Sequence, residues 1–351
     1  MTLLRSRGLA LLVAAAVLAV CLALGLLTGA AGISPRGIAL ALLDRLPFVS
    51  VDPGLTPAEQ GILFQLRVPR VLIAAMVGGL LAIAGAGYQG VFRNPLADPY
   101  LLGAAAGAGL TVTLVVVFLG GRVGVIAVPV AAFSGAIGGV LLAYALGRSA
   151  GRGGGGVGGG AGGGAATLVL AGVAVTSFLT AIQTFVQQLK VEELQRIYAW
   201  ILGDVGGGWE DVWMIAPYAL VSTVVLLLHG RLLDVLSVGE EEAVSLGLHA
   251  ARARMIVLLA ASLATASAVA VGGLIAFVGI VVPHVVRRLA GWSYRIVLPV
   301  SFVGGAAFLV LADLIARSVL APAELPIGVV TAFVGAPFFV MVLRMSRAVN
   351  T

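Results

Sequence analysis

The sequence predicts an all-α, polytopic membrane protein with about ten transmembrane helices. Its 351 residues are 60% hydrophobic and only 10% charged, with a mean hydropathy of +1.13. A soluble domain carries about 25% charged residues, so this composition excludes an ordinary soluble enzyme. The apolar residues fall into runs close to the roughly 20 residues that one helical crossing requires, and the runs do not alternate as barrel strands do. Because a backbone in lipid must satisfy its own hydrogen bonds, we expect the runs to be helices.

Ten apolar runs are the expected spans, in this order: Leu9–Leu27, Val71–Val91, Leu101–Leu119, Val123–Leu146, Leu168–Leu189, Val212–Leu228, Met255–Val271, Leu274–Val286, Val297–Ile315 and Ile327–Leu343. The first exceeds the apolar core of a signal peptide, so we expect it to stay as a span. The eighth is too short to cross fully, and we expect it to end at Pro283-His284. Short helices in transporters often border the substrate path, although a buried half-helix without a transport role is equally consistent.

Residues 1–351 are expected to form one transmembrane domain with three long connections. Residues 33–66 are predicted to be an external loop, with a short surface helix around Pro57–Gln65. Residues 148–166 are predicted to be a cytoplasmic linker, because eleven of the fourteen positions from 151 to 164 are glycine. This stretch lacks the Gly-Lys-Ser/Thr ending of a phosphate-binding loop and follows no strand. Residues 230–254 form a second cytoplasmic loop in this prediction.

The basic residues predict the orientation. An even number of spans places both termini on one side, and that side collects thirteen Lys and Arg residues against eight on the other. The positive-inside rule therefore predicts cytoplasmic termini, and the plasma membrane is the expected location. The 21 basic residues, which give a net charge of +6, are scattered between the apolar runs. This pattern argues against nucleic-acid binding and for loop charges that determine the topology of the chain in membrane lipid. Cys21 is the only cysteine, and the three histidines do not group, so we expect no metal site and no cofactor.

Three motifs resemble those of the FecCD-type permease family, the membrane subunits of ABC importers for ferric siderophores, haem and cobalamin. They are Leu66-Arg67-Val68-Pro69-Arg70 continued by Gln89-Gly90-Val91-Phe92-Arg93-Asn94-Pro95-Leu96-Ala97-Asp98-Pro99, then Gly273-Leu274-Ile275-Ala276-Phe277-Val278-Gly279-Ile280-Val281-Val282-Pro283-His284, and Glu324-Leu325-Pro326-Ile327-Gly328-Val329-Val330-Thr331. The resemblance implies the type II ABC importer permease fold. It also implies that two copies enclose a pore, with two cytoplasmic ATPase subunits and an external substrate-binding protein. The frequency of substrates within that family favours a ferric siderophore, with cobalamin and haem close behind.

The resemblance assigns roles to three arginines. In similar proteins, arginines at the positions of Arg67 and Arg70 pair with glutamates of the binding protein, and Arg317 matches a third. Guanidinium groups suit bidentate pairing with carboxylates. The alternatives are snorkelling of Arg67 and Arg70 to the interface, and pairing of Arg317 with Asp313 four residues earlier on one helix face.

A short acidic helix is expected in the loop 230–254. Its residues are Gly239, Glu240, Glu241, Glu242, Ala243, Leu246 and Gly247, with the acidic groups in the first turn, where they complement the helix dipole. The resemblance implies a coupling helix that sits in a groove of the ATPase. The alternative is a solvated surface helix without a partner.

The fifth run carries a polar stripe at helical spacing: Thr176, Thr180, Gln183, Thr184 and Gln187. Such a stripe either bonds to neighbouring helices or lines a wet path, and the resemblance favours the lining of the translocation path. The resemblance also places a cytoplasmic gate at Asn94, Pro95 and Leu96. A second gate element carries small hydroxyl residues in some relatives, whereas Ala165 and Ala166 stand there in this sequence.

Other function classes are weaker. The sequence contains no Walker motif, so ATP hydrolysis is expected in a separate subunit and the chain itself is not expected to be an enzyme. An ion-coupled secondary transporter is the alternative, and it would need ionisable groups at mid-membrane. Only Asp313 lies well inside a run, and Arg317 can neutralise it. No paired carboxylates or His-Glu-x-x-His motif points to an intramembrane enzyme.

Overall fold

The computed structural model describes residues 7–29, 31–120, 126–153, 163–239 and 249–348. Within these ranges the regular structure is helical and contains no strand, which confirms the predicted all-α class. All ten apolar runs correspond to helices: α1 (Arg7–Leu27), α4 (Val68–Phe92), α5 (Ala104–Leu114), α6 (Ala127–Gly153), α7 (Gly163–Leu189), α9 (Trp209–Leu228), α12 (Ala250–Gly272), α13 (Val278–Ala290), α14 (Tyr294–Ser318) and α15 (Ile327–Ala348). Seven helices in the described part are long and apolar enough to cross a membrane. The shorter α5 continues as a π-helical segment, Val115–Leu119.

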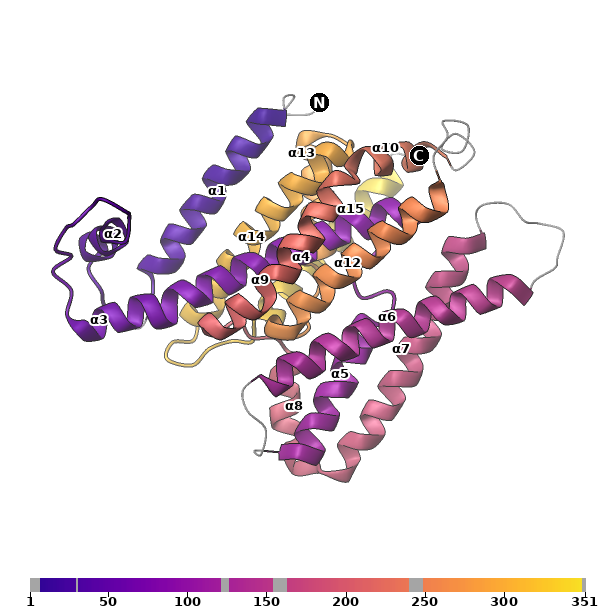
Figure 1. Cartoon of the computed structure of the whole chain (residues 1–351), viewed down its shortest axis with the longest axis horizontal. Helices are drawn as coiled ribbons and strands as arrows, with labels where there is room; N and C mark the ends of the chain where they lie inside the picture. The colour runs from indigo at the N-terminus through magenta and orange to yellow at the C-terminus, as the bar shows by residue number, and fades with distance from the viewer. Residues whose placement is uncertain (1–6, 30, 121–125, 154–162, 240–248, 349–351) are drawn as a thin grey trace.

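Helix α4 is the centre of the bundle. Nineteen of its 25 residues are buried, and it packs against α14, α12, α13 and α9. Helices α5, α6 and α7 form a neighbouring group that joins the rest mainly through contacts of α6 with α12 (Figure 1). The start of α1 and the ends of α4, α13 and α15 lie at one end of the bundle, here called the basic end (Figure 1). The opposite end, which carries α2 and α3, is called the α3 end.

Glycines allow the closest contacts of α4. Gly78 faces the backbone carbonyl of Gly305 on α14, and Gly85 faces the backbone of Gly279 on α13. A Cβ atom at either position would collide with these backbones. Lipid is as apolar as the side chains, so helices in a bilayer associate through such close packing and not through a hydrophobic driving force.

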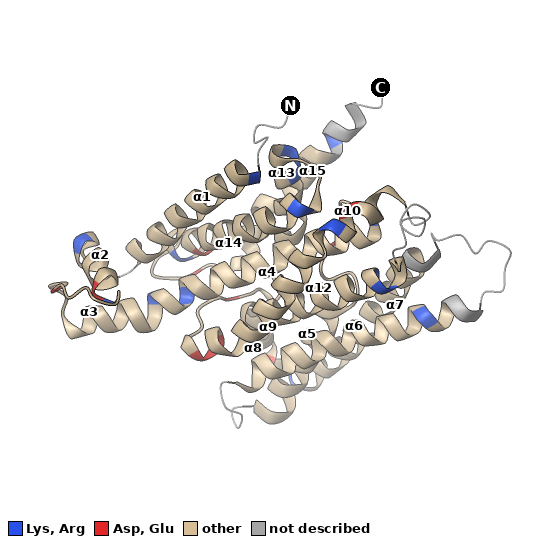
Figure 2. Ribbon diagram, turned by 45° about the horizontal axis from the view of Figure 1, so that its top comes forward, with Lys and Arg blue, Asp and Glu red and all other residues tan. Residues whose placement is uncertain are grey.

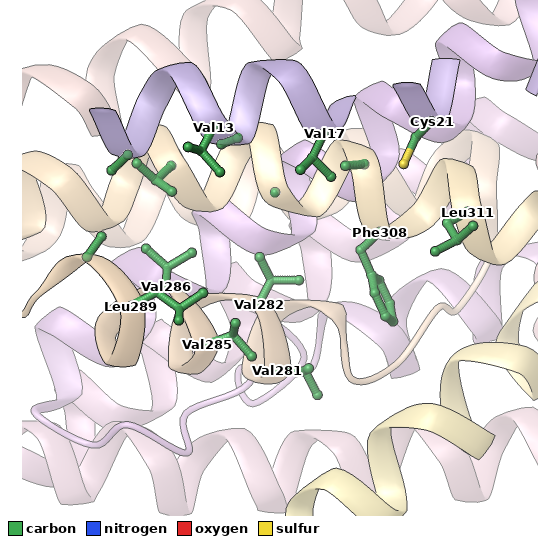
Figure 3. Close-up of a pocket in the computed structure, with 16 residues that line it drawn as sticks. Val13, Val17, Cys21, Val281, Val282, Val285, Val286, Leu289, Phe308 and Leu311 are labelled. Atoms are coloured by element: carbon green, nitrogen blue, oxygen red, sulfur yellow. The ribbon is translucent and has the colours of Figure 1, made fainter. Parts of the chain in front are cut away.

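Helix α1 has the opposite character. It packs mainly on α14, and most of its side chains are exposed, among them Leu12 and Val20. An apolar groove of about 330 Å³ lies between α1, α13 and α14, lined by residues such as Val17, Val282 and Phe308 (Figure 3). Exposed apolar surface of this extent on a 21-residue helix is what a membrane span presents to acyl chains.

The segment predicted to be an external loop, residues 33–66, contains more helix than expected. The predicted surface helix is present as α3 (Pro57–Gly61), whose capping box joins Thr56 and Glu59. It continues through a π-helical segment (Ile62–Arg67) directly into α4. Helix α2 (Pro35–Asp44) was not predicted, although Ser34 caps its first turn and Pro35 opens it, a common start signal.

The two connections predicted to be cytoplasmic contain less non-helical chain than predicted. Helix α6 extends to Gly153 and α7 begins at Gly163, so both ends of the predicted linker 148–166 are helical, and residues 154–162 lie outside the described part. Within the predicted loop 230–254, α10 spans Gly230–Val238 and α12 begins at Ala250. A 3₁₀ turn (Val191–Glu193) and α8 (Leu194–Ile201) connect α7 to α9.

The expected end of the eighth span at Pro283 is wrong. Helix α13 begins four residues later than the apolar run, at Val278, and passes through Pro283 to Ala290. The delayed start follows a non-helical segment in which Gly273 and Phe277 adopt positive φ angles of 68° and 71°. The helix is short, as predicted, because this segment replaces its first turns.

Substitution of Gly78 by alanine tests the central packing. We expect the variant to lose about 1–3 kcal/mol of stability, because the new methyl group overpacks the contact with Gly305. The matched control is Gly138→Ala on α6, where a Cβ meets no atom within 4 Å and the better helix propensity of alanine should be neutral or stabilising. Thermal unfolding midpoints in detergent measure both, and equal midpoints would contradict the packing argument.

Candidate functional site

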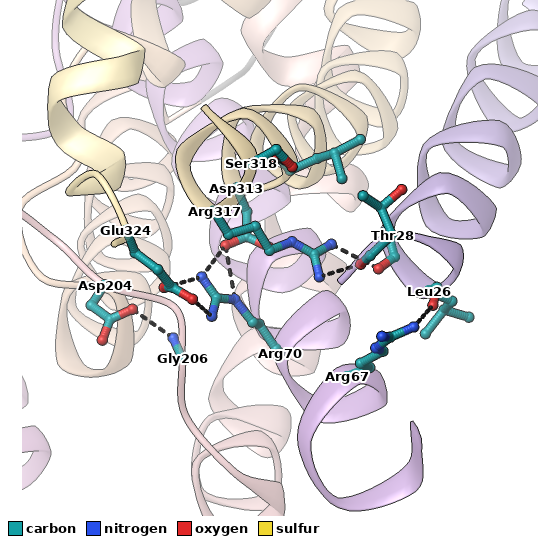
Figure 4. A network of polar contacts seen from close by, with 12 residues as sticks. Leu26, Thr28, Arg67, Arg70, Asp204, Gly206, Asp313, Arg317, Ser318 and Glu324 are labelled. Atoms are coloured by element: carbon teal, nitrogen blue, oxygen red, sulfur yellow. Dashed lines mark hydrogen bonds and ion pairs between the residues drawn. The ribbon is translucent and has the colours of Figure 1, made fainter. Parts of the chain in front are cut away.

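Five charged residues meet at the α3 end of the bundle, around the start of α4 (Figure 4). Arg70 is their centre. Its Nε and Nη2 atoms donate to Oδ1 of Asp313 on α14, at 3.0 and 2.8 Å. Its Nη1 and Nη2 atoms donate to the two carboxylate oxygens of Glu324, at 3.0 and 2.8 Å. One guanidinium group therefore joins α4 to α14 and to the connection between α14 and α15.

Arg67 and Arg317 hold the end of α1. Arg67 is 5% exposed and donates to the carbonyls of Leu26, at 2.9 Å, and Ala31. Arg317 donates to the carbonyls of Gly25 and Thr28, at 2.7 and 2.9 Å. The last carbonyls of a helix lack partners within the helix and carry partial negative charge, so two cations stabilise the end of α1.

The predicted pair of Asp313 and Arg317 is present as well. Arg317 Nε lies 3.3 Å from Asp313 Oδ2, and the Asp313 side chain is 1% exposed. Glu324 is half exposed, and its hydrogen bonds from Arg70 lower the pKa of its carboxyl below the usual range. Three guanidinium groups against two carboxylates leave one net positive charge beside a cavity of about 520 Å³. All three arginines predicted to dock the binding protein thus have internal partners, and Arg70 keeps the most exposed side chain, at 17%. Their docking role stays a prediction.

The predicted gate residues Asn94, Pro95 and Leu96 are exposed in the turn after α4, at the basic end. Arg93 ends the helix in the left-handed conformation, and Asn94 Oδ1 accepts a hydrogen bond from the Leu96 amide at 2.9 Å. Asn94 therefore shapes the turn through its own side chain. The second predicted gate element, Ala165 and Ala166, lies at the start of α7, where Ala166 is exposed.

The polar stripe of α7 divides into two parts. Gln183 and Gln187 are buried, and Gln183 lies against Gly109 of α5. Thr176 is half buried, whereas Thr180 and Thr184 are exposed. The hydroxyl of Thr184 donates to the carbonyl of Thr180 at 2.9 Å. Gln183 thus joins the α5–α7 contact in this chain, and Thr180 and Thr184 are the part of the stripe that remains exposed.

The predicted coupling helix lies almost wholly outside the described residues. Gly239 is buried and follows α10, whereas Glu240, Glu241, Glu242, Ala243, Leu246 and Gly247 belong to the undescribed segment 240–248. In the described part, no three His, Cys, Asp or Glu residues are grouped to hold a metal ion. His284 instead packs its ring edge-on against Phe338, with centroids 5.7 Å apart.

A buried polar junction at the basic end was not predicted. Gln89 of α4 is 1% exposed and bonds to Ala97 in the turn, to Gly279 on α13 and to Arg287, itself 3% exposed. The sequence carried one usable signal, because Gln89 and Arg287 are polar residues at the ends of otherwise apolar runs.

Replacement of Arg70 by methionine should destabilise the protein by about 3–5 kcal/mol, because buried Asp313 then keeps only Arg317. Glu324→Gln removes the half-exposed partner of the same arginine and should cost less than about 1 kcal/mol. Thermal unfolding midpoints in detergent compare the two variants. A Glu324 variant as unstable as the Arg70 variant would contradict this assignment.

Comparison with known proteins agrees with this architecture. The family model of the FecCD transport family matches residues 17–345. The chain is 42% identical over 295 residues to the uncharacterised ABC transporter permease YvrB of Bacillus subtilis, covering 82% of this chain and 80% of that protein. It is 39% identical over 292 residues to the cobalamin import permease BtuC of Halobacterium salinarum, covering 83% and 75%.

A solved structure has the same fold. It belongs to a protein described as an ABC transporter of the metal-chelate type in an inward-facing conformation, with a TM-score of 0.80, 27% identity and coverage of 97% of this chain and 99% of that one. Permeases of this kind work with a separate ATPase subunit and a binding protein, so the chain is a transport subunit and not an enzyme. The motifs, the fold and the relatives agree that the chain belongs to the FecCD transport family.

Proposed function

We propose that two copies of this chain form the pore of an importer in the plasma membrane. The pore receives a bulky metal chelate or corrinoid (an iron-siderophore, cobalamin or haem) from an external binding protein. Two copies of a cytoplasmic ATPase supply the energy. Relatives that carry cobalamin and metal chelates support this substrate class.

One observation carries the proposal: the three motif segments, distant in sequence, meet on α4. Glu324 bonds to Arg70 at its α3 end, and Gln89 bonds to Gly279 at its basic end. Tyr100 lies in the connection after α4. Its hydroxyl donates to the carbonyl of Ile275 and accepts from the Ile275 amide, at 3.1 Å each. The family signature is therefore one physical unit that runs the length of the central helix.

The distribution of charge supports cytoplasmic termini. The basic end carries Arg7 at the start of α1, Arg93 directly after α4 and Arg288 in the last turn of α13. Figure 2 shows further Lys or Arg positions at this end. At the α3 end, by contrast, carboxylates compensate much of the positive charge, as they do for Arg70. The positive-inside rule therefore favours the basic end as the cytoplasmic side, where the ATPase would bind at residues 239–247.

The α3 end would then be the docking surface for the binding protein. The net positive charge beside the cavity favours an acidic partner, and Arg70 is the arginine with the most accessible guanidinium. The exposed Thr180 and Thr184, with the gate turn Asn94–Leu96, are the candidates for the pore lining between two copies.

Reconstitution in lipid vesicles tests the function. The chain with its co-purifying ATPase and binding protein should import ferric siderophore, cobalamin or haem only when ATP is present. Uptake should survive ionophores that dissipate proton and sodium gradients, because Asp313, the acidic group well inside a span, is held by Arg70 and Arg317. Uptake that follows an ion gradient without the ATPase would instead establish a secondary transporter.

Glu324→Gln tests the docking surface. Loss of this carboxylate frees part of Arg70, so the affinity for an acidic binding protein should rise, by about threefold to tenfold at low salt. The matched control is Glu192→Gln, an equal change of charge at an exposed site in the turn between α7 and α8, outside the charged cluster around Arg70. Titration of the binding protein against both variants in nanodiscs measures the effect, which is refuted if the two variants bind alike.

A further inference from the structure

The unpredicted junction at the basic end uses every polar atom of the Gln89 side chain. Its Nε2 donates to the carbonyls of Ala97 and Gly279, at 3.3 and 3.0 Å, and its Oε1 accepts from Arg287 Nη1 at 2.5 Å. One side chain therefore holds the gate turn, α4 and α13 in a fixed relation. Because the junction is buried, a broken hydrogen bond there leaves an unpaired polar group away from water, which is costly.

Pro283 explains why Gly279 can take part. A proline lacks the backbone N–H that would bond to the carbonyl four residues earlier, and in α13 that carbonyl belongs to Gly279. The Nε2 donor of Gln89 fills the vacant place. Pro283 in α13 thus leaves free the carbonyl to which Gln89 of α4 donates.

Arg287 connects the junction to Tyr294, the first residue of α14. Its guanidinium lies 5.5 Å from the centroid of the Tyr294 ring, and Nη2 is 3.4 Å from the Tyr294 hydroxyl. No carboxylate among the described residues forms an ion pair with it, but it lies in the last turn of α13, where the helix dipole favours a cation. The buried charge therefore depends on Gln89 and Tyr294 for its hydrogen bonds.

Helix α10 also contacts Tyr294. Asp234 accepts hydrogen bonds from the Tyr294 amide and the Ser293 hydroxyl, at 2.5 and 2.7 Å, and so caps the N-terminus of α14. Leu233 of α10 and the Tyr294 ring pack against Gly90 of α4, where there is no room for a Cβ atom. Asp234 therefore connects α10 to the backbone of Tyr294, whose ring and hydroxyl contact Arg287.

We propose that Asp234, Tyr294, Arg287 and Gln89 form a relay that transmits the movement of α10 to the gate turn Asn94–Leu96, through the bond from Gln89 to Ala97. Gln89 and Arg287 are positioning residues in this relay. The inference rests on the proposed function, since α10 directly precedes the segment proposed to bind the ATPase. The relay gives that function a route from the ATPase to the gate.

The first experiment uses the full chain alone in lipid nanodiscs. Gln89→Glu keeps an acceptor for Arg287 but loses the donor to Ala97 and Gly279, so the protein should fold while the turn loosens. Hydrogen exchange of the amides in residues 94–103 should accelerate about tenfold, as expected for one lost buried hydrogen bond. Tyr88→Phe is the control. Tyr88 directly precedes Gln89 on α4 but lies outside the relay, and the substitution removes its 2.7 Å hydrogen bond to Ser262. Unchanged exchange in Gln89→Glu, or equal acceleration in Tyr88→Phe, overturns the relay.

The second experiment uses the complex with the co-purifying ATPase. Gln89→Glu and Arg287→Met should each import about tenfold less substrate per ATP hydrolysed, with ATP hydrolysis and ATPase retention unchanged. The double variant should be no worse than either single one, because both interrupt the same route. A variant with a loosened turn that still imports at the wild-type yield overturns the relay. Failure of the wild-type complex to import with ATP would refute the proposed function instead, and hydrogen exchange would still decide whether Gln89 holds the turn.

Discussion

The close backbone packing of α4 is the constraint on which the rest of the structure depends. In a bilayer, helices gain little by exchanging lipid contacts for protein contacts unless their backbones approach closely. Gly78 and Gly85 permit this approach to α14 and α13. Because α4 is then enclosed on almost every side, any polar group near its ends must find partners within the protein.

The two ends of α4 meet this requirement in different ways. At the α3 end, Arg70 pairs with two carboxylates, one of them half exposed and therefore open to exchange with an external partner. At the basic end, Gln89 bonds to neutral groups and to one buried arginine, out of contact with water. The first arrangement suits recognition by another charged protein. The second suits mechanical linkage, since its members cannot separate without leaving buried groups unpaired.

Several features were predictable because they depend on local composition. The ten runs correspond to ten helices, since hydropathy over about 20 residues reports the solvent of each segment. The predicted helix near Pro57 is present, as is the pair of Asp313 and Arg317, which are four residues apart on one helix. Pro283 was misread as a helix end because the partner of the carbonyl it frees, Gln89, lies 190 residues away.

The membrane class, the order of the spans, the absence of a nucleotide motif and the likeness to FecCD permeases could all be inferred without coordinates. Each of these follows from residue type and spacing along the chain. The contacts of the buried polar residues, by contrast, required the folded bundle: Arg67 and Arg317 bond to the end of α1, Gln183 packs against α5 and Gln89 bonds to Arg287. The reason is that a side chain buried in a membrane bundle takes its partners from helices distant in sequence, and a linear pattern does not record which helices are neighbours.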